Sequence, residues 1–523
     1  MSKKSQYELE REANIARNRA LFEDLGLKDA IKDLGVSTGP KKSTAKPVQP
    51  RGQKRDKPDA ENQPRRQSRR LMGKLQGDPN ETPEQRVQRE KEEEERREAE
   101  RLEAEEKARI AKRPRHDTLN FITLAEENNP QELSKLTDLM ESIPQSSALS
   151  QQGGTDAYDF EDNKQHQKET NELRRKVENL KVISRAKVTT NRIYCAAYHP
   201  EKSKDLIFFG DKHGQLGIWD ARAPPDEEDD DGDISPENRE GGKYWRFQLH
   251  WPATPKSSIS CIKMDPLDSH NVYTSSYDCT IRSLSFASGS SQEVYSTDDG
   301  ALICSFDITA TGQQMWIAHG DGSVNHVDLR ENKSKTRRYG LSEAKIGSIS
   351  INPTYNQYLL TASNSRFLKV WDARKLATIP VELLGDDGDD GALEFTSSVV
   401  ADYMQSEQAK GLFRGEFKHN KSASSAYWNP NGRAIVSTSY DDNLRIWDVQ
   451  KSSLKGAGEF ANFKPFCHIK HNCQTGKWLT ILRAQWSPNP DAYPHFTVGN
   501  MNHGLDIYSV KGELITQLAD PTR

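Results

Sequence analysis

The stretch Ser422 to Val449, SASSAYWNPNGRAIVSTSYDDNLRIWDV, predicts three short strands joined by two tight turns. The first strand ends in Asn429-Pro430-Asn431-Gly432, where proline fixes φ and glycine tolerates a positive φ. The second strand, 434–439, is built from small and β-branched residues, as expected for a strand that packs on both faces. After a second turn, the third strand closes on Trp447-Asp448, and this closing pair is typical of one blade of a β-propeller.

The pattern recurs five more times in the chain. Each copy ends on an aromatic or aliphatic residue followed by Asp or Ser, and most of the first strands end in a turn that contains proline. Two intervals between copies match the repeat of roughly 40–45 residues expected of such propellers, whereas the other intervals require insertions in loops. One blade cannot bury both faces of its sheet alone, so the copies must stack in a ring. The further copies cover Ile193 to Arg222, Ser258 to Phe286, Ala301 to Arg330, Ile346 to Arg374 and Thr480 to Val510.

We therefore predict an all-β fold, a WD-repeat β-propeller over residues 173–523. It has six clear blades and, if the ring has seven, an incomplete seventh blade. We expect residues 173–184 to lead into the first blade and to supply its closing strand. The outer strand of the fourth blade is expected at 378–384, just before an acidic insertion.

The chain before the propeller predicts disorder and isolated helices. Residues 1–35 contain an amphipathic helix with a narrow apolar stripe, and residues 36–81 form a basic linker that cannot bury a core. Residues 82–113 form a charged helix that begins at Thr82 and is supported by i,i+4 ion pairs, and residues 114–172 form a linker with short helical patches. The basic linker is either a nuclear-import signal or a phosphate-binding arm.

Composition narrows the class of protein. Only 33% of the residues are apolar and 29% are charged, which agrees with a largely disordered N-terminal region. No apolar run predicts a membrane span or a secretory signal. All six cysteines lie in the predicted propeller and are interpreted as reduced structural thiols, and the spacing of Cys467 and Cys473 fits no strong zinc pattern. We expect no metal or cofactor, and the absence of known catalytic motifs predicts that the protein is not an enzyme.

The loops at one end of the propeller are candidates for nucleic-acid binding. In this fold, the loops between the second and third strands and the loops between blades emerge on one face. Here they are rich in basic residues, which is typical of a protein that binds phosphate backbones, while Tyr277 and Tyr440 are candidates to stack on bases. An ordinary lysine-rich solvated face is the alternative. The candidate residues are Lys187, Arg192, Lys212, His213, Lys256, Tyr277, Arg366, Lys418, His419, Lys421, Tyr440, Lys470, His471, Lys477 and Arg483.

Arg483 departs from the residues that occupy its position in the other blades. The same column holds Cys195, Cys261 and Cys304 in the first three blades and serine in the next two. An arginine among such small residues disturbs packing unless its guanidinium reaches the mouth of the central channel. We therefore expect Arg483 at the channel mouth.

The opposite face receives the ends of the third strands, where Trp-Asp-Ala-Arg occurs twice and Val-Asp-Leu-Arg once. An Asp and an Arg two positions apart on a strand point the same way and can pair. Such a pair either presents its arginine to a partner or only fixes its own turn. The candidates for partner docking are Asp220, Arg222, Asp328, Arg330, Asp372 and Arg374.

Several strings resemble the fungal DNA damage-binding WD-repeat family, also called the changed-mutation-rate type. They lie in the N-terminal helix and across the propeller: YELEREANIARNRAL, RIYCAAYHP, GDKHGQLGIWDAR, FKHNKSASSAYWNPNGR, STSYDDNLRIWD, HNCQTGKWLTILRAQWSP and TVGNMNHGLDIYS. That family is similar to the small subunit of the ultraviolet-damaged-DNA-binding complex. Its members usually carry one more repeat after the position of 512–518.

The resemblance implies a nuclear protein associated with chromatin. It implies binding to single- and double-stranded DNA with a preference for ultraviolet-damaged DNA, and a role in the DNA damage response or DNA metabolism. The Trp-Asp-x-Arg ends match the motif by which related propellers dock the adaptor of a cullin ubiquitin ligase. The alternative function is a protein-interaction scaffold, such as a cullin-ligase substrate receptor or a binder of histones.

Overall fold

The computed structural model forms two compact units, Met1–Glu90 and Lys91–Arg523, and only the second contains described residues. The expectations for residues 1–35, 36–81 and all but three residues of 82–113 therefore lie outside the described residues. The described ranges are 96–97, 101, 115–125, 130–145, 163–201, 204–224, 241–297, 299–331, 336–381, 393–456, 458–460, 462–476, 479–489 and 492–519.

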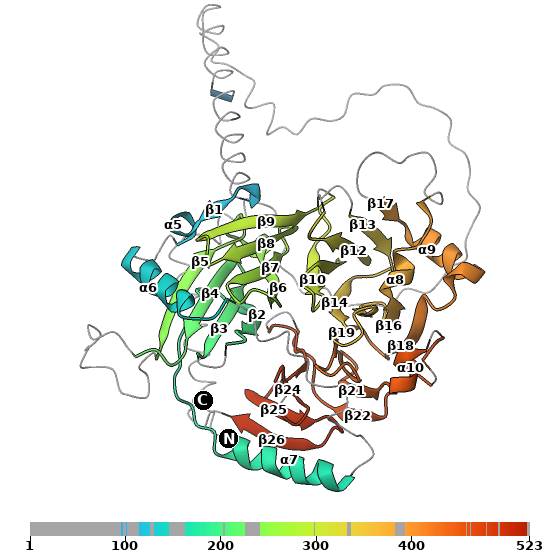
Figure 1. Ribbon diagram of the computed structural model, residues 1–523. Helices are drawn as coiled ribbons and strands as arrows, with labels where there is room; N and C mark the ends of the chain where they lie inside the picture. The colour runs from blue at the N-terminus through green and yellow to red at the C-terminus, as the bar shows by residue number, and fades with distance from the viewer. Residues whose placement is uncertain are drawn as a thin grey trace, which may run out of the picture. The chain divides into compact units, whose positions relative to one another are not determined.

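Six sheets, each with four antiparallel strands in chain order, confirm the predicted six-bladed propeller (Figure 1). In each blade the first strand is the innermost and the last is the outermost. Blade 1 contains β2 (Ile193–Tyr198), β3 (Leu206–Asp211), β4 (Gln215–Asp220) and β5 (Lys243–Gln248); blade 2 contains β6 (Ile259–Met264), β7 (Asn271–Ser276), β8 (Thr280–Ser285) and β9 (Ser290–Ser296); blade 3 contains β10 (Ile303–Ile308), β11 (Gln314–His319), β12 (Ser323–Asp328) and β13 (Arg337–Gly340).

The last three blades follow the same order. Blade 5 is the copy from which the pattern was first taken. Blade 4 contains β14 (Ile346–Ile351), β15 (Tyr358–Ser363), β16 (Phe367–Asp372) and β18 (Phe413–Lys418); blade 5 contains β19 (Ala423–Trp428), β20 (Ala434–Ser439), β21 (Asn443–Asp448) and β22 (Cys467–Lys470); blade 6 contains β23 (Gln485–Trp486), β24 (His495–Gly499), β25 (Gly504–Ser509) and β26 (Leu514–Ala519).

Two blades gain a fifth strand, and short helices decorate the ring. Strand β1 (Leu119–Asn120) pairs with β9, and β17 (Leu393–Phe395) pairs in parallel with β13. The helices are α5 (Phe121–Leu124), α6 (Pro130–Glu141), α7 (Asn163–Glu178), α8 (Ala373–Leu376), α9 (Ser397–Met404) and α10 (Lys451–Lys455), with 3-10 turns η2 (Pro255–Ser257) and η5 (Glu407–Ala409).

The inner strands lie side by side around the channel, and their register corrects one expectation. Strand β2 contacts β6, and the same relation continues through β10, β14, β19 and β23. A β-bulge follows the first residue of each inner strand in blades 1 to 5, so Cys195 and Cys261 align with Ser305 in blade 3. Cys304, which we expected in this column, is the extra residue of its bulge.

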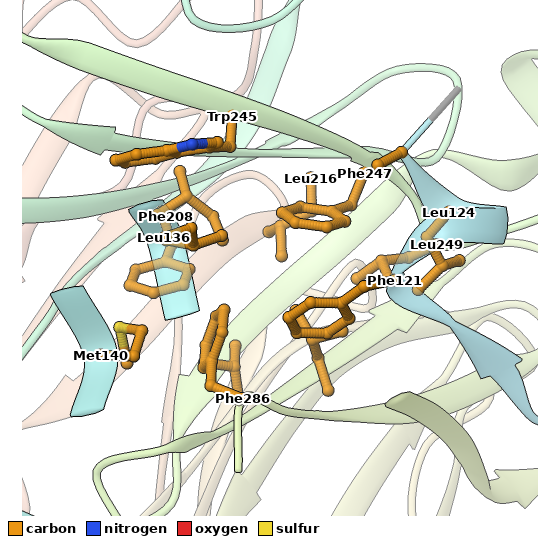
Figure 2. Packing of buried hydrophobic residues seen from close by; sticks show 14 of the residues in the cluster. Phe121, Leu124, Leu136, Met140, Phe208, Leu216, Trp245, Phe247, Leu249 and Phe286 are labelled. Atoms are coloured by element: carbon orange, nitrogen blue, oxygen red, sulfur yellow. The ribbon is translucent and has the colours of Figure 1, made fainter. Parts of the chain in front are cut away.

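Residues 115–125 and 130–145, which belong to the segment that the sequence predicts as a linker with short helical patches, pack on blades 1 and 2. Figure 2 shows Phe121, Leu124, Leu136 and Met140 against aromatic residues of β3 and β5 and against Phe286, which directly follows β8. Burying each such side chain contributes roughly 1.5–3 kcal/mol. The fully buried Arg282 adds a polar tie, because its guanidinium donates to the backbone carbonyl oxygens of Arg115 and Asp117 at 2.9 and 2.6 Å.

Helix α7 covers the outermost strand of blade 6. Its Val177 packs with Ile507 and Ile515, and Arg174 donates to the carbonyl oxygen of Ile515 at 3.1 Å. Residues up to Glu178 are therefore helical, and the closing strand that we expected within 173–184 was wrong. The helical spacing of Leu173 and Val177, which share one face, explains the difference.

The outer strand of blade 4 also differs from expectation. Residues 373–376 form α8, and the strand that pairs with β16 is β18, beyond the insertion. Asp372 begins α8 by accepting a hydrogen bond from the backbone N–H of Arg374 at 3.1 Å. This cap turns the chain away from the sheet edge, so the expected strand at 378–384 was wrong.

Candidate nucleic-acid interface

One end of the propeller carries both the turns between second and third strands and the connections between blades. Antiparallel strands alternate in direction, so these two kinds of loop must emerge at the same end. We call this end the loop face. Backbone hydrogen bonds join the two sets of loops: Lys212 N–H to Arg192, Tyr277 to Ser258, Gly320 to Leu302, Asn364 to Lys345, and Tyr440 to Ser422, all at 2.8–3.0 Å.

Each turn on the loop face has one residue with a positive φ. In blade 3 it is Gly322 at φ +95°, where a Cβ atom would lie 2.0 Å from the carbonyl oxygen of Ser342. In blade 4 it is Arg366 at φ +78°, a conformation that an ordinary residue adopts at a cost of roughly 1–2 kcal/mol. The turn thus presents an exposed arginine from a strained position. The remaining positions are Gly214, Cys279, Asp442 and His503.

Most of the predicted cations reach the surface of the loop face. Lys418 also lies over the ring of Phe367, with its Nζ 5.3 Å from the ring centroid. Arg192 is partly buried and donates to Tyr194 Oη at 2.7 Å. Lys477 lies outside the described residues. The exposed candidates on this face are Lys256, Arg366, Lys418, Lys421 and Lys470, while Lys212 and His213 are partly buried. Lys187 is also exposed, but its carbonyl oxygen accepts from Arg246 in the middle of β5, on the flank of blade 1.

Two predicted histidines are structural and do not reach this surface. His419 is only 2% exposed, and its Nδ1 lies 3.0 Å from Arg445 Nη1. Burial, and then the charge of Arg445, lowers the pKa of His419 to about 4. His471 is also buried, and its Nε2 lies 3.0 Å from the carbonyl oxygen of Gly499. Both rings support the loops beneath the surface, so burial removes them from the list of contact candidates.

The two candidate stacking tyrosines are partly buried and already make contacts. Lys345 donates to Tyr277 Oη at 3.2 Å, and its Nζ also lies 5.0 Å from the ring centroid. Tyr440 Oη lies 3.4 Å from Thr475 Oγ1. From the sequence, Lys345 counts among the basic residues of the connections between blades, although it is not in the final list of DNA-binding candidates. Its place on a connection between blades, directly before the inner strand β14, is the signal that identified it.

Arg483 lies where the column argument placed it, on the inner side of blade 6. The next residue, Ala484, is held by a hydrogen bond from its N–H to Thr438 Oγ1 at 2.9 Å. The guanidinium of Arg483 lies near the side chains of Tyr427, Cys261 and Cys195, which come from blades 5, 2 and 1. Side chains from these three blades can surround one group only inside the ring. The guanidinium therefore faces the central channel.

Blade 3 interrupts the basic character of the loop face. Arg338 pairs there with Asp299 and Asp321, and its Nε donates to Ser323 Oγ at 3.0 Å. Burial alone would raise the pKa of Asp299, but hydrogen bonds from Thr297, Ala301 and Arg338 bring it to about 2. The charge of Arg338 is thus paired with carboxylates, and the exposed basic candidates lie over blades 1, 4 and 5.

The opposite end of the propeller carries the Asp-x-Arg ends. Arg330 contacts Asp328 through two hydrogen bonds of 3.0 and 2.6 Å, and Arg374 contacts Asp372 at 3.1 and 2.8 Å. Hydrogen bonds from Arg330 lower the pKa of Asp328 to about 2.

Both of these arginine side chains remain mostly exposed, at 59% and 70%. In blade 1 the expected side-chain pair is wrong. The backbone N–H of Arg222 donates to Asp220, but its guanidinium pairs with Asp205.

The described residues offer no group of three His, Cys, Asp or Glu side chains that could hold a metal ion. Within the same ranges, no helix is both long and apolar enough to cross a membrane. All six cysteines are free thiols. Burial raises the pKa of Cys195 and Cys304 above the usual range, so these thiols stay protonated at neutral pH.

These features define a WD-repeat β-propeller, and the family model described as "WD domain, G-beta repeat" matches residues 412–448. The chain belongs to the family of fungal proteins named DNA damage-binding protein CMR1. The relative from Cryptococcus neoformans is 35% identical over 99% of this chain and 93% of its own length. Those from Mycosarcoma maydis and Neurospora crassa are 29% and 30% identical, over 99% and 98% of this chain and 94% and 92% of theirs.

The chain also aligns with a solved structure named "Crystal Structure of Mitotic Checkpoint Complex". The TM-score is 0.35 and the identity 15%, over 50% of this chain and 64% of that chain. This likeness is too slight to carry an argument.

Proposed function

We propose that this protein binds DNA through the loop face and acts, without catalysis, in the DNA damage response in the nucleus. The observation that carries the proposal is the set of exposed cations over blades 1, 4 and 5, on loops that are tied to one another by backbone hydrogen bonds. The relatives named DNA damage-binding proteins support it. Cations fixed in position neutralise phosphates and release counterions without first ordering the loops.

Phosphate contacts of this kind position DNA but do not read its sequence. The same face therefore accepts double-stranded and single-stranded DNA. A preference for ultraviolet-damaged duplexes follows if binding exposes a base, because a distorted base pair costs less to open. Tyr277 and Tyr440 lie on the loop face and supply rings against which an unpaired base can stack.

The test compares two triple variants of the full chain. Lys418→Glu/Lys421→Glu/Lys470→Glu reverses three exposed cations of the loop face. Lys410→Glu/Lys455→Glu/Lys464→Glu makes the same change in net charge on exposed lysines next to β16, β18 and β21, at the opposite end of blades 4 and 5. Binding to undamaged and ultraviolet-irradiated duplexes is measured over a salt series.

We expect the loop-face variant to lose most of its affinity, and the control to bind as the original protein does. The original protein should show a linear fall of log affinity with log salt. Equal affinity of the two variants would move the DNA site away from the loop face.

A second candidate function is docking of a partner protein at the opposite end. The observation that favours it is that Arg330 and Arg374 are held in fixed directions by their aspartates while their side chains stay exposed. Preset arginines suit an acidic or carbonyl-rich partner surface. We propose the adaptor of a cullin ubiquitin ligase first and histones second. Loss of co-purification with the adaptor in Arg330→Ala/Arg374→Ala, with DNA binding intact, would support this function; unchanged co-purification would contradict it.

A further inference from the structure

Lys345 and Tyr277 meet across the mouth of the central channel. Tyr277 lies on the turn between β7 and β8 of blade 2, whereas Lys345 lies on the connection that leads into blade 4. Their polar atoms are 3.2 Å apart. Blades 2 and 4 are not neighbours in the ring, so this contact spans the end of blade 3 and places the ammonium group over the channel.

Arg483 enters the same channel from blade 6. Its neighbours include Tyr277, which is the partner of Lys345, and Cys304 lies within electrostatic range of both cations. The surroundings of Cys304 in blade 3 therefore include one cation from blade 4 and one from blade 6. Tyr427, near the far end of the inner strand β19, also lies close to Arg483.

Neither cation has a carboxylate partner among the described residues. The groups nearest to Arg483 are phenols and thiols, and its Nε is buried without a hydrogen-bond partner. Lys345 likewise faces Cys304 and Tyr277. A third channel cation shows the contrast: Lys263 Nζ lies 2.9 Å from Asp307 Oδ1. Asp307 also accepts a hydrogen bond from the Ile351 N–H at 2.8 Å, so it is already occupied.

Two enclosed cations without a counter-charge are costly unless an anion joins them. Arginine and lysine beside tyrosine hydroxyls match the oxygens of a phosphate group, which can accept several charge-assisted hydrogen bonds at once. We propose that the channel mouth binds one phosphate group of a DNA single strand, held by Arg483 and Lys345 with Tyr277 as a further donor. This inference rests on the proposed function and names the part of the strand that the face holds.

A DNA strand would approach the site in two stages. The exposed lysines at the rim attract the backbone, and their contacts are the same for every phosphate. The channel mouth then receives a single phosphate. A duplex of regular shape holds its phosphates along two smooth ridges, whereas a single strand or an opened lesion can turn one phosphate inward. The channel site therefore favours single-stranded and damaged DNA over intact duplex.

The first experiment uses the full chain with Arg483→Gln, Lys345→Met and both together. Arg374→Gln, which removes an exposed arginine at the opposite end, is the matched control. Binding of a single-stranded oligonucleotide and of an undamaged duplex is measured over a salt series. We expect the double variant to bind the single strand about tenfold more weakly and to lower the salt slope by about one, while duplex affinity changes less than about twofold.

A second arm distinguishes a phosphate of DNA from a free anion. Inorganic phosphate is added at constant ionic strength, and the melting temperature is recorded. Stabilisation of the original protein but not of the double variant locates the phosphate site in the channel. If inorganic phosphate stabilises both proteins equally and single-strand affinity is also unchanged in the double variant, the proposal is overturned.

A third experiment uses only the original protein, so its result does not depend on whether Arg483→Gln folds. A single neutral methylphosphonate is moved along the oligonucleotide, and affinity for the original protein is measured at each position. One position with a loss of about fivefold or more supports a single dedicated phosphate site. Equal small losses at every position would contradict it.

The outcomes also separate this inference from the proposed function. If the loop-face variant Lys418→Glu/Lys421→Glu/Lys470→Glu loses DNA while the channel variants bind normally, only the channel site fails. If the loop-face variant binds DNA as the original protein does, the proposed function fails at that face.

Discussion

Arg338 and Arg483 are both enclosed arginines at the loop end of this propeller, but their surroundings are opposite. Arg338, in blade 3, pairs with Asp299 and Asp321, and Glu394 lies 3.7 Å from its Nε. Arg483, in blade 6, has no carboxylate partner among the described residues. The same side chain is thus neutralised in one blade and left with its charge in the other.

This difference separates a structural charge from one that is available to a ligand. A buried cation with its carboxylates in place adds little net stability, but removing one partner is costly because the remaining charges stay enclosed. A cation without a partner keeps its full attraction for an anion that arrives later. The two arginines carry the same charge, but only Arg338 is paired with carboxylates. Arg483 therefore keeps its charge available for an anionic ligand.

The largest expected effect is the loss of stability when Arg338 is replaced. Arg338→Met leaves Asp299 and Asp321 together without a cation, and both are partly exposed, which moderates the cost. We expect the free energy of unfolding to fall by about 2–3 kcal/mol. Arg483→Met is the matched variant and should change stability by less than about 1 kcal/mol, because no carboxylate is left behind.

Urea unfolding followed by circular dichroism measures both variants. The comparison would fail if Arg483→Met were as destabilising as Arg338→Met. That result would mean that Arg483 supports the ring rather than a ligand.

The next effect concerns acid, through His319 beside the Arg338 cluster. His319 is fully buried, and burial followed by the charge of Arg338 lowers its pKa to about 4, against smaller opposing effects of Asp321, the Ala301 backbone and Asp299. The unfolded chain takes up this proton near pH 6.5, so stability is present above that pH and is lost as pH falls toward 4. This single group removes about 2 kcal/mol between pH 7 and pH 5.

His319→Phe removes the titrating group while keeping a ring near Tyr295, whose centroid lies 6.2 Å away. Melting temperatures of both proteins are compared at pH 7 and pH 5. The original protein should lose more stability than the variant at the lower pH. Parallel losses would show that His319 does not govern this step, and would direct attention to His326 and His419, whose pKa values are also lowered to about 4, mainly by burial.

The sequence contained most of the fold because each blade repeats a local pattern. The turn at Asn429-Pro430-Asn431-Gly432 and the closing Trp447-Asp448 reflect neighbouring residues only, so they could be predicted without tertiary information. The outer strand of blade 4 could not, since β18 pairs with β16 across an insertion of about forty residues. The bulge that puts Ser305 rather than Cys304 in the inner column depends on pairing with β11 and is likewise invisible in the sequence.

The candidate site was predicted less completely for the same reason. Lysines such as Lys418 and Lys421 were found because loops at one end of a propeller share a face. His419 was misassigned because basic character does not reveal burial beneath Arg445. Lys345 was recognised as a basic loop residue, but its contact with Tyr277 could not be predicted because the two residues lie in blades far apart in the sequence.

A smaller effect is expected at the strained turn of blade 4. Gly322 in blade 3 and Arg366 in blade 4 occupy the same left-handed position, but only Arg366 bears a side chain. Arg366→Gly should stabilise the fold by up to about 1 kcal/mol, because the strain is relieved. It should also weaken DNA binding and lower the salt slope by up to about one. If Arg366→Gly gains stability but its DNA binding has an unchanged salt slope, Arg366 does not contact DNA, and DNA binding does not account for the strained backbone.

The smallest effect is expected at Arg374, which is a third kind of arginine, paired but exposed. Its side chain is 70% exposed, so its contacts with Asp372 are open to water and contribute little. Asp372 keeps its structural role without that side chain, because it accepts the backbone N–H of residue 374 at the start of α8. Arg374→Ala should therefore change the free energy of unfolding by less than about 0.5 kcal/mol. Asp372→Ala should lower the free energy of unfolding by about 1 kcal/mol, because the helix cap is lost.

Urea unfolding of the two variants measures the difference, and equal losses would show that the ion pair, rather than the cap, holds this strand end. A near-zero cost at Arg374 would mean that its fixed direction does not serve the fold, which leaves contact with a partner as the physical reason for the arrangement.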